Sequence, residues 1–589
     1  MEALKARFPE LGFHPLQAPS SHPHYLYDPF HPSSRILGAG HQKTEGRRKF
    51  DVDTIFEKDV AVKMRDNATL FTDVFRPVSS DGDVKVPAVL AWSPYGKSGG
   101  VQTYDSMGPF RCGLPLGTTS GYEKFEAPDP ADWCGRGYAI LNIDARGAGD
   151  SDGDIAFWGE QEAEDVHDTI GWASQQPWCN GSVAMAGNSW LAIAQVNYAS
   201  RYAHPALKAL APWEAATDPY RDLLARGGIP HTHFVRMIHN GMAGKGGMED
   251  AAAMLEVHHP FVDEYWATKL IHTENIDVPL YLTASYSTGL HSRGSFDTFK
   301  RAKSTKKWLR VHPYQEWWDL YRKEVNDELQ SFFDKYCKNM DNTWESTPPL
   351  RVSLLGFDGS RAKTIVERPT EKYPVPGTEH RRYFLDASKG SLSLSKPQNE
   401  MKTSHDAHHL TDCSDFVVQF DENTELAGYP MAKLCMSCDE HDDMDVVVQI
   451  RKIGKDGIPL VSMNYKCPVP EPEVPDVNIA KFLGPDGMLR ASHRVSRRMI
   501  DDNLEYAHDR AEKVPRGEVV SLEIPIWPIG MVFEAGEGIM LRVAGHDLRL
   551  PETEMLRSDK PLDENVGRHQ IHTGGRWDSF LVVPVIAEG

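Results

Sequence analysis

The sequence lacks three features that would each point to a particular class of protein. It has no apolar run long enough to cross a lipid bilayer, and its eight cysteines are spread too thinly over 589 residues for a disulfide framework. Its formal charge of −20 argues against nucleic acid or an anionic membrane surface as a partner. The first residues contain no apolar segment of the secretory type. We therefore expect a globular, cytoplasmic protein with reduced cysteines that acts on a small molecule.

Motifs that hold cofactors or metal ions are also scarce. Cys435 and Cys438 have the spacing of half a zinc site, but they have no second cysteine pair nearby and fall on an alternating, strand-like segment. The histidines of residues 1–50 have no acidic or cysteine partner at ligand spacing, and the glycines of 243–247 are not preceded by a strand, as a phosphate loop requires. We expect no cofactor and no metal ion.

The most informative stretch that is present surrounds Ser189. A short apolar run ends in Gly187-Asn188-Ser189-Trp190, and a helical run of small residues from Leu191 to Ser200 follows at once. This order predicts a strand, a tight turn and a helix with the serine at the apex, which is the arrangement of a nucleophile elbow. The second glycine of the common Gly-x-Ser-x-Gly pattern is missing, so the interpretation depends on the surrounding sequence.

The surrounding pattern predicts an α/β domain. Almost wholly apolar runs, typical of parallel strands covered on both faces, alternate with helical segments such as Glu164–Ser174; the predicted strands include 86–92, 137–144, 278–284 and 307–312. Such a doubly wound parallel sheet carries its chemistry at the carboxyl ends of the strands. Residues 214–275 are mostly helical in pattern and lie between two sheet elements, so we expect them to form a cap over the site.

The two ends of the chain have different characters. Residues 1–50 are rich in histidine, proline, serine and glycine and are predicted to form an extended arm. From residue 348 short alternating segments are separated by glycine, proline and aspartate, which predicts an all-β sandwich. The expected organisation is an arm (1–50), an α/β domain (51–213 and 276–347), a helical cap (214–275) and a β domain (348–589) with surface for a homodimer.

Three motifs in combination point to a known family: Asp144-x-Arg146-Gly147-x-Gly149-x-Ser151-x-Gly153, Gln176-Pro177-Trp178-Cys179-Asn180-Gly181 and the segment 213–222. From about residue 55 to the end, the sequence resembles the family of cocaine esterase, α-amino-acid ester hydrolases and X-prolyl dipeptidyl aminopeptidases. The resemblance implies an α/β-hydrolase domain with a helical cap and a C-terminal jelly roll, with Ser189 as the nucleophile. It also implies two donors to an oxyanion, the amide of Trp190 and the hydroxyl of Tyr95.

The other two positions of the family's catalytic triad carry different residues here. The segment that matches the family's Gly-Trp-Tyr-Asp reads Ala284-Ser285-Tyr286-Ser287, which places Ser287 at the acid position. The segment that matches Pro-Trp-x-His reads Pro313-Tyr314-Gln315-Glu316, which places Glu316 at the histidine position. A serine hydroxyl is a poor nucleophile without a base, so these substitutions bear directly on the chemistry.

Three interpretations stay open. In the first, which we favour, the triad is rebuilt with His291 or His312 as the base and Glu316 as the group that orients it, so that the protein is a serine-dependent esterase or amidase of a small or medium organic acyl compound. In the second, the fold keeps its oxyanion hole and uses Glu316 as an acid or base for isomerisation, cyclisation, C–C cleavage or decarboxylation. In the third, the protein binds a ligand without turning it over.

Overall fold

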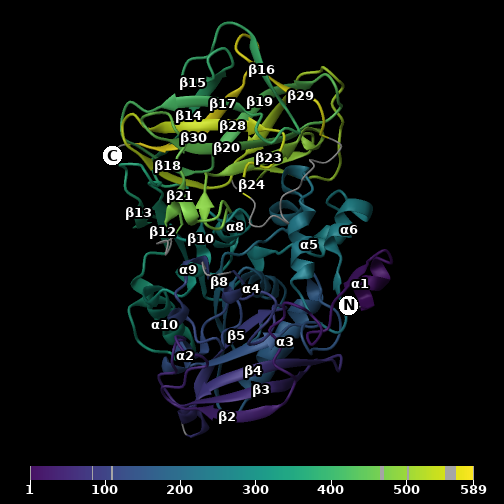
Figure 1. The fold of residues 1–589 in the computed structure, drawn as a ribbon, viewed down its shortest axis with the longest axis vertical. Coiled ribbons are helices and arrows are strands. Elements are labelled where there is room, and N and C mark those ends of the chain that lie inside the picture. Colours follow the sequence, from purple (N-terminus) through teal and green to yellow (C-terminus); the bar gives the residue numbers. More distant parts are fainter. Residues whose placement is uncertain are drawn as a thin grey trace.

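A mixed sheet lies at the centre of the N-terminal part of the molecule (Figure 1). The computed structural model describes residues 2–82, 84–107, 111–464, 470–500, 503–550 and 565–587. The strands of the sheet follow the order β13 (Ile365–Pro369), β12 (Leu350–Leu354), β11 (Lys307–His312), β10 (Leu280–Ser285), β8 (Leu207–Trp213), β7 (Cys179–Asn188), β5 (Val86–Ser93), β6 (Ala139–Asp144), β4 (Thr69–Pro77), β3 (Thr54–Lys63) and β2 (Ser33–Leu37).

The strands between β12 and β6 are parallel, and both edges of the sheet are antiparallel. Every residue of β5, β6 and β10 is buried, because helices cover the sheet on both faces. The strands predicted at 86–92, 137–144, 278–284 and 307–312 are therefore confirmed, and so is the α/β-hydrolase class of the core.

Two groups of helices cover this sheet. Helices α3 (Glu160–Ser174) and α4 (Trp190–Arg201) pack together against β5 and β7. Helices α2 (Pro130–Gly135) and α10 (Lys323–Cys337) contact each other, where Trp133 Nε1 donates a hydrogen bond to Asn326 Oδ1 at 3.0 Å. The two groups lie on opposite sides of β5 in Figure 1, and α8 (Ser292–Arg301) packs on β10 and β11. All of these connections bring the carboxyl ends of the parallel strands to one edge.

The segment between β8 and β10 forms short helices over that edge. It contains the π-helical turn Pro219–Leu224, α5 (Thr232–Asn240), the short strand β9 (Gly247–Glu249), α6 (Ala251–Ala253), a second π-helical turn Met254–His258 and α7 (Glu264–Ala267). It contacts the C-terminal part, because Arg221 Nη2 donates to the carbonyl oxygen of Ala507 at 2.6 Å.

Both ends of the predicted α/β domain extend further than the sequence pattern indicated. The first fifty residues are not wholly an extended arm, since they contain α1 (Glu2–Arg7), β1 (Phe13–Pro15), which pairs with β9, and β2, which pairs with β3 at the sheet edge. Beyond residue 347, β12 and β13 still belong to the central sheet. Regular pairing in these segments depends on distant partners, which local composition does not reveal.

The C-terminal part is rich in β-structure, as predicted (Figure 1). Its main sheet contains β14 (Thr378–Asp386), β15 (Ser391–Ser393), β16 (Met401–Asp406), β17 (Ser414–Gln419), β18 (Thr424–Gly428), β19 (Met431–Cys438), β20 (Asp445–Ile453), β23 (Asp486–Arg490), β26 (Val520–Pro525), β27 (Ile529–Phe533), β28 (Gly538–Ala544), β29 (Arg568–Thr573) and β30 (Phe580–Ile586). Two small two-stranded sheets, β21 (Ser462–Met463) with β22 (Lys481–Phe482) and β24 (Arg497–Ile500) with β25 (Asn503–Tyr506), lie outside this sheet. Among the described residues, no helix has the length and apolar character needed to span a bilayer.

Candidate active site

Ser189 occupies the turn between β7 and α4 in a strained conformation. Its φ of 54° and ψ of −118° place the side chain at the apex of the turn, where it is partly exposed. The turn requires glycine at position 187, because a Cβ atom there would lie 2.4 Å from Leu191 Cδ2 and 2.9 Å from the carbonyl oxygen of Glu126. The predicted strand, tight turn and helix are therefore present, with Ser189 at the apex and Leu191 where the common pattern has its second glycine.

His291 lies against this serine. Its Nε2 atom is 3.2 Å from Ser189 Oγ, and only 4% of the residue is exposed. The imidazole precedes α8, at the end of the loop that follows β10. Ser292 fixes this loop, since its hydroxyl donates to the carbonyl oxygens of Ser285 at 2.6 Å and Thr288 at 2.8 Å. A short, closed loop at the carboxyl end of β10 therefore places an imidazole at the serine.

Glu316 lies on the opposite side of the same imidazole. It is the first residue of α9 (Glu316–Leu320), and its Oε2 atom is 3.5 Å from His291 Nδ1. The start of α9 is fixed by Gln315, whose side chain accepts a hydrogen bond from the amide of Trp318 at 2.8 Å. The structure thus brings together Ser189, His291 and Glu316 in the order serine, histidine and carboxylate.

The charges around His291 favour its protonated form. Burial by itself would lower the pKa of the imidazole, but the carboxylate of Glu316, followed by Glu214 and Glu126, outweighs burial and raises the pKa above its usual value. An imidazole that gains basicity from a carboxylate behind it suits a group that must accept a proton from a serine hydroxyl.

The two predicted oxyanion donors also meet at the serine. The Tyr95 hydroxyl lies within hydrogen-bonding reach of the Ser189 side chain and of the Trp190 backbone. Burial, reinforced by the nearby Glu126, raises the pKa of Tyr95 well above its usual value, so the phenol keeps its proton and can donate it in a hydrogen bond. Lys124 holds the loop of Tyr95 in place, since its Nζ atom donates to the carbonyl oxygens of Ser93 and Gly96 at 3.0 and 2.7 Å.

The structure separates the other two sequence candidates from the serine. His312 is buried at the end of β11, and its Nε2 atom is 3.1 Å from Glu214 Oε1 and 3.8 Å from Asp319 Oδ2. Ser287, at the family's acid position, donates a hydrogen bond to Ser285 Oγ at 3.2 Å. His291 is therefore the histidine that contacts Ser189; in the described part of the chain, His312 instead faces Glu214 and Ser287 is bonded to Ser285.

Two buried glutamates near His291 had no assigned role in the sequence analysis. Glu214 follows β8 directly, with a φ of 55°, and accepts a hydrogen bond from the Thr288 hydroxyl. Glu126 also has a positive φ, and its Oε1 atom accepts hydrogen bonds from Asn188 Nδ2 at 3.1 Å and Trp317 Nε1 at 2.8 Å. The sequence could have pointed to Glu214 as a site residue, because it is an acidic residue at the carboxyl end of a parallel strand. No comparable signal exists for Glu126, which reaches the site from a loop.

One set of residues could hold a metal ion. Among the described residues, Glu214, His291 and Glu316 form the group of three in which one ligand atom from each lies within 4.8 Å of the others. Cys435 and Cys438 lie three positions apart on β19, so their side chains point to opposite faces of the strand and cannot both bind one ion. The predicted packing role of these cysteines agrees with their burial.

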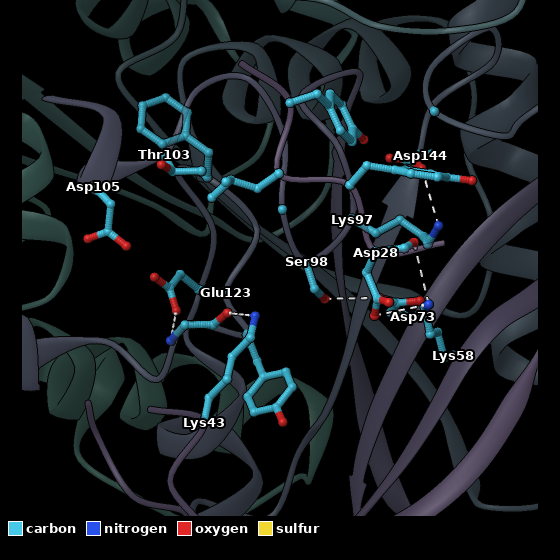
Figure 2. Close-up of a pocket in the computed structure, with 18 of the residues that line it drawn as sticks. Asp28, Lys43, Lys58, Asp73, Lys97, Ser98, Thr103, Asp105, Glu123 and Asp144 are labelled. Carbon is cyan, nitrogen blue, oxygen red and sulfur yellow. Dashed lines mark hydrogen bonds and ion pairs between the residues drawn. The ribbon is translucent and has the colours of Figure 1, made fainter. Parts of the chain in front are cut away.

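A cavity of about 810 Å³ lies beside the loop that carries Tyr95 (Figure 2). Its wall includes Phe125, whose ring packs against Tyr95 with centroids 5.7 Å apart. Figure 2 shows charged side chains of both signs around it, including Lys97 with Asp144, at 3.5 Å, and Asp73 with Ser98, at 3.0 Å. Ser189, His291 and Tyr95 are not among the residues that line this cavity.

The same architecture and sequence features occur in known hydrolases. The family model of the X-Pro dipeptidyl-peptidases (S15 family) matches residues 66–256, and the model of the X-Pro dipeptidyl-peptidase C-terminal non-catalytic domain matches residues 342–582. The cocaine esterase of Rhodococcus sp. (strain MB1 Bresler) is 23% identical over 90% of this chain and 98% of its own sequence.

Solved structures agree with these matches. A CocE/NonD family hydrolase from Staphylococcus aureus superposes with a TM-score of 0.83 and is 30% identical, covering 95% of this chain and 97% of its own. An α-amino acid ester hydrolase shares the fold, with a TM-score of 0.66 and 16% identity over 91% of this chain and 97% of its own. The chain therefore belongs to the CocE/NonD family of hydrolases, which is related to the X-Pro dipeptidyl-peptidases.

Proposed function

We propose that the protein is a serine hydrolase that cleaves ester or amide bonds of small or medium organic acyl compounds with a triad of Ser189, His291 and Glu316. The observation that carries the proposal is the 3.2 Å contact between Ser189 Oγ and His291 Nε2, with Glu316 behind the imidazole. The nature of the family supports a hydrolytic reaction, and the elbow supports a serine nucleophile.

The proposed reaction follows from the positions of these atoms. His291 Nε2 accepts the proton of Ser189 Oγ as the oxygen attacks the carbonyl carbon of the substrate. The negative charge that develops on the carbonyl oxygen is stabilised by the Trp190 amide and the Tyr95 hydroxyl. His291 then gives the proton to the leaving group, and an acyl-enzyme remains on Ser189. Water, deprotonated by the same imidazole, releases the acid and restores the serine.

In this proposal, the acid and the histidine have exchanged loops relative to the family pattern. The histidine follows β10, where relatives carry the aspartate, and the carboxylate follows β11, where relatives carry the histidine. The exchange is geometrically possible because β10 and β11 are parallel neighbours, with Ser285 opposite His312 in the register. Their carboxyl ends therefore present side chains to the same space beside Ser189.

The test is covalent labelling with a fluorophosphonate, followed by intact-mass measurement. We expect one rapid addition to the wild type and none to Ser189→Ala. We expect His291→Ala to slow labelling by at least a hundredfold, because the serine loses its base, and Glu316→Gln to slow it by about tenfold or more. Ser287→Ala is the matched control and should label within twofold of the wild type.

Each contrary outcome identifies a different alternative. Normal labelling of His291→Ala combined with loss in His312→Ala would overturn the assignment of the base. A folded wild type that does not label would overturn the serine hydrolase itself and favour either chemistry driven by Glu316 or ligand binding without turnover.

A further inference from the structure

Three buried side chains behind Ser189 each have a polar atom that lacks a hydrogen bond of good geometry. These atoms are Glu214 Oε1, His291 Nδ1 and Glu316 Oε2, and the residues are at most 8% exposed. His312 Nε2 is 3.1 Å from Glu214 Oε1 but lies out of line for a hydrogen bond. Leaving a buried polar atom poorly paired is unfavourable. His291 Nδ1 and Glu316 Oε2 face each other at 3.5 Å, so all three atoms have only weak partners, and an ion placed among them would gain three ligands.

The charges in this space point to a cation. Two carboxyl groups face one imidazole, and one ligand atom of each residue lies within 4.8 Å of the others. Burial of two carboxylates together is unfavourable unless positive charge compensates them. The imidazoles of His312 and His291 supply part of this positive charge. A divalent ion supplies two charges and can contact all three residues.

The donor set also selects the kind of ion. One imidazole nitrogen with two carboxylates suits Zn²⁺ and related transition metals, whereas Mg²⁺ and Ca²⁺ prefer oxygen ligands alone. His291 Nδ1 and Glu316 Oε2 are 3.5 Å apart. An ion about 2.1 Å from each of them would have a ligand angle of roughly 110°, which is close to tetrahedral.

We propose that Glu214, His291 and Glu316 form a binding site for a divalent transition-metal ion of the Zn²⁺ type, and that the bound ion silences Ser189. The Thr288 hydroxyl, which donates to Glu214, holds one of the ligands in place. Ion binding is independent of the proposed function, whereas the silencing rests on His291 being the base for Ser189.

The silencing follows from the proton on the imidazole. As a base for Ser189, neutral His291 carries its proton on Nδ1 and offers the lone pair of Nε2. An ion on Nδ1 uses the lone pair of that nitrogen, so the single ring proton must move to Nε2. The imidazole then donates a hydrogen bond to Ser189 Oγ and has no lone pair left to accept the serine proton.

Binding is tested first, in a variant that cannot react. Metal-free, full-length Ser189→Ala is titrated calorimetrically with Zn²⁺ and, separately, with Mg²⁺. We expect one site for Zn²⁺ with no comparable Mg²⁺ binding, and a loss of Zn²⁺ affinity of at least tenfold when Glu214→Gln is added. As a control, His22→Ala with His24→Ala removes one partly buried and one exposed histidine of the arm and should leave the affinity unchanged. Equal Zn²⁺ affinity with and without Glu214→Gln would overturn the site.

Silencing is tested by the ratio of fluorophosphonate labelling rates without and with Zn²⁺, measured within each variant. We expect at least a tenfold ratio in the wild type, its reversal by a chelator, and a ratio near one in Glu214→Gln. Thr288→Val keeps all three ligands but removes the hydroxyl that donates to Glu214, so we expect an intermediate ratio of labelling rates. This variant replaces Glu214→Gln if Glu214→Gln does not fold. Rapid labelling that Zn²⁺ does not change would overturn the inference and leave the serine hydrolase standing. Zn²⁺ binding to a wild type that never labels would overturn the hydrolase and leave the site standing.

Discussion

Glu214 and Glu126 are both buried beside His291, yet the pKa values of their carboxyl groups shift in opposite directions. Burial favours the neutral form of both, but for Glu214 the imidazoles of His312 and His291 and the Thr288 hydroxyl outweigh burial and lower the pKa. For Glu126, burial, reinforced by the charge of Glu316, outweighs the neutral donors of Trp317 and Asn188 and the more weakly acting His291, and it raises the pKa to about 8. The environment therefore gives two identical side chains opposite protonation states near neutral pH.

This assignment predicts that Glu126→Gln stabilises the protein increasingly as the pH rises. The unfolded carboxyl has a pKa near 4.3, whereas the folded one has a pKa of about 8, so between these values the folded wild type holds the extra proton and loses stability with rising pH. Glutamine has the shape of the neutral carboxyl and binds no proton, so the variant does not lose stability in this way as the pH rises. The free energy of unfolding of both proteins, measured with denaturant at pH 5, 7 and 8.5, should diverge by at least 1 kcal/mol over this range.

The exposed Glu518→Gln serves as the control, since its stability should follow that of the wild type at every pH. A difference between Glu126→Gln and the wild type that does not change with pH would show that Glu126 is ionised at neutral pH.

At the level of single residues, the sequence identified the participants of the site but not their pairing. The strand, turn and helix pattern located Ser189, whereas the roles of Tyr95 and Trp190 came from the resemblance to a family. The choice between His291 and His312 was left open, since it depends on how Ser292 closes the loop after β10. Glu126 was missed because its approach to the site depends on a backbone contact with a distant segment, where its carbonyl oxygen accepts from the Asn188 amide at 3.0 Å.

At the level of elements, the loop after β5 depends on a single buried lysine. Lys124 is fully buried, and its Nζ atom donates to the carbonyl oxygens of Ser93, Gly96 and Ile143 at 3.0, 2.7 and 2.9 Å. These carbonyls lie at the carboxyl ends of β5 and β6 and in the turn after Tyr95. The lysine therefore fixes the phenol relative to Ser189, and burial lowers the pKa of the amine to about 7.

Lys124→Met should consequently impair the oxyanion loop more than the nucleophile. The methionine fills a similar volume but leaves three carbonyl groups without a donor, at a cost of about 1–3 kcal/mol for each group that water does not reach. We expect a lower melting temperature and a fall in kcat for an ester substrate of at least tenfold, with a smaller change in KM. Lys63→Met, on the exposed side of β3, is the control, and equal kinetics in the two variants would contradict the role of Lys124.

The elements themselves were predictable to different degrees. The parallel strands were evident because burial on both faces requires continuous apolar runs, and their bounds agree within about two residues. Strand β2 was missed because four of its five residues are exposed and it pairs only along the edge of the sheet. Strands β12 and β13 were assigned to the β domain because their alternating pattern does not show which sheet they join.

At the scale of the whole molecule, the β-rich part contains buried histidines that face one another. His405 on β16 and His569 on β29 are opposite each other in the register, both are fully buried, and their rings are 5.6 Å apart. Burial lowers the pKa of His405 to about 4 and that of His569 to about 3. Neighbouring charged and titratable groups act on them less strongly than burial; these are Asp406, Asp412, His408, His441, His546 and Arg568.

These histidines predict that mild acid destabilises the protein through its C-terminal part. The unfolded imidazoles have a pKa near 6.5, so between about pH 6.5 and 4 the unfolded chain binds protons that the folded chain does not, and stability falls as the pH falls. Each histidine contributes up to about 1.4 kcal/mol per pH unit in this window. His405→Gln combined with His569→Gln should therefore flatten the fall in melting temperature between pH 7 and 4.5, whatever its effect at pH 7. His22→Gln with His24→Gln, in the exposed arm, should leave the fall unchanged, and an equally steep fall in the buried double variant would show that other groups cause the acid sensitivity.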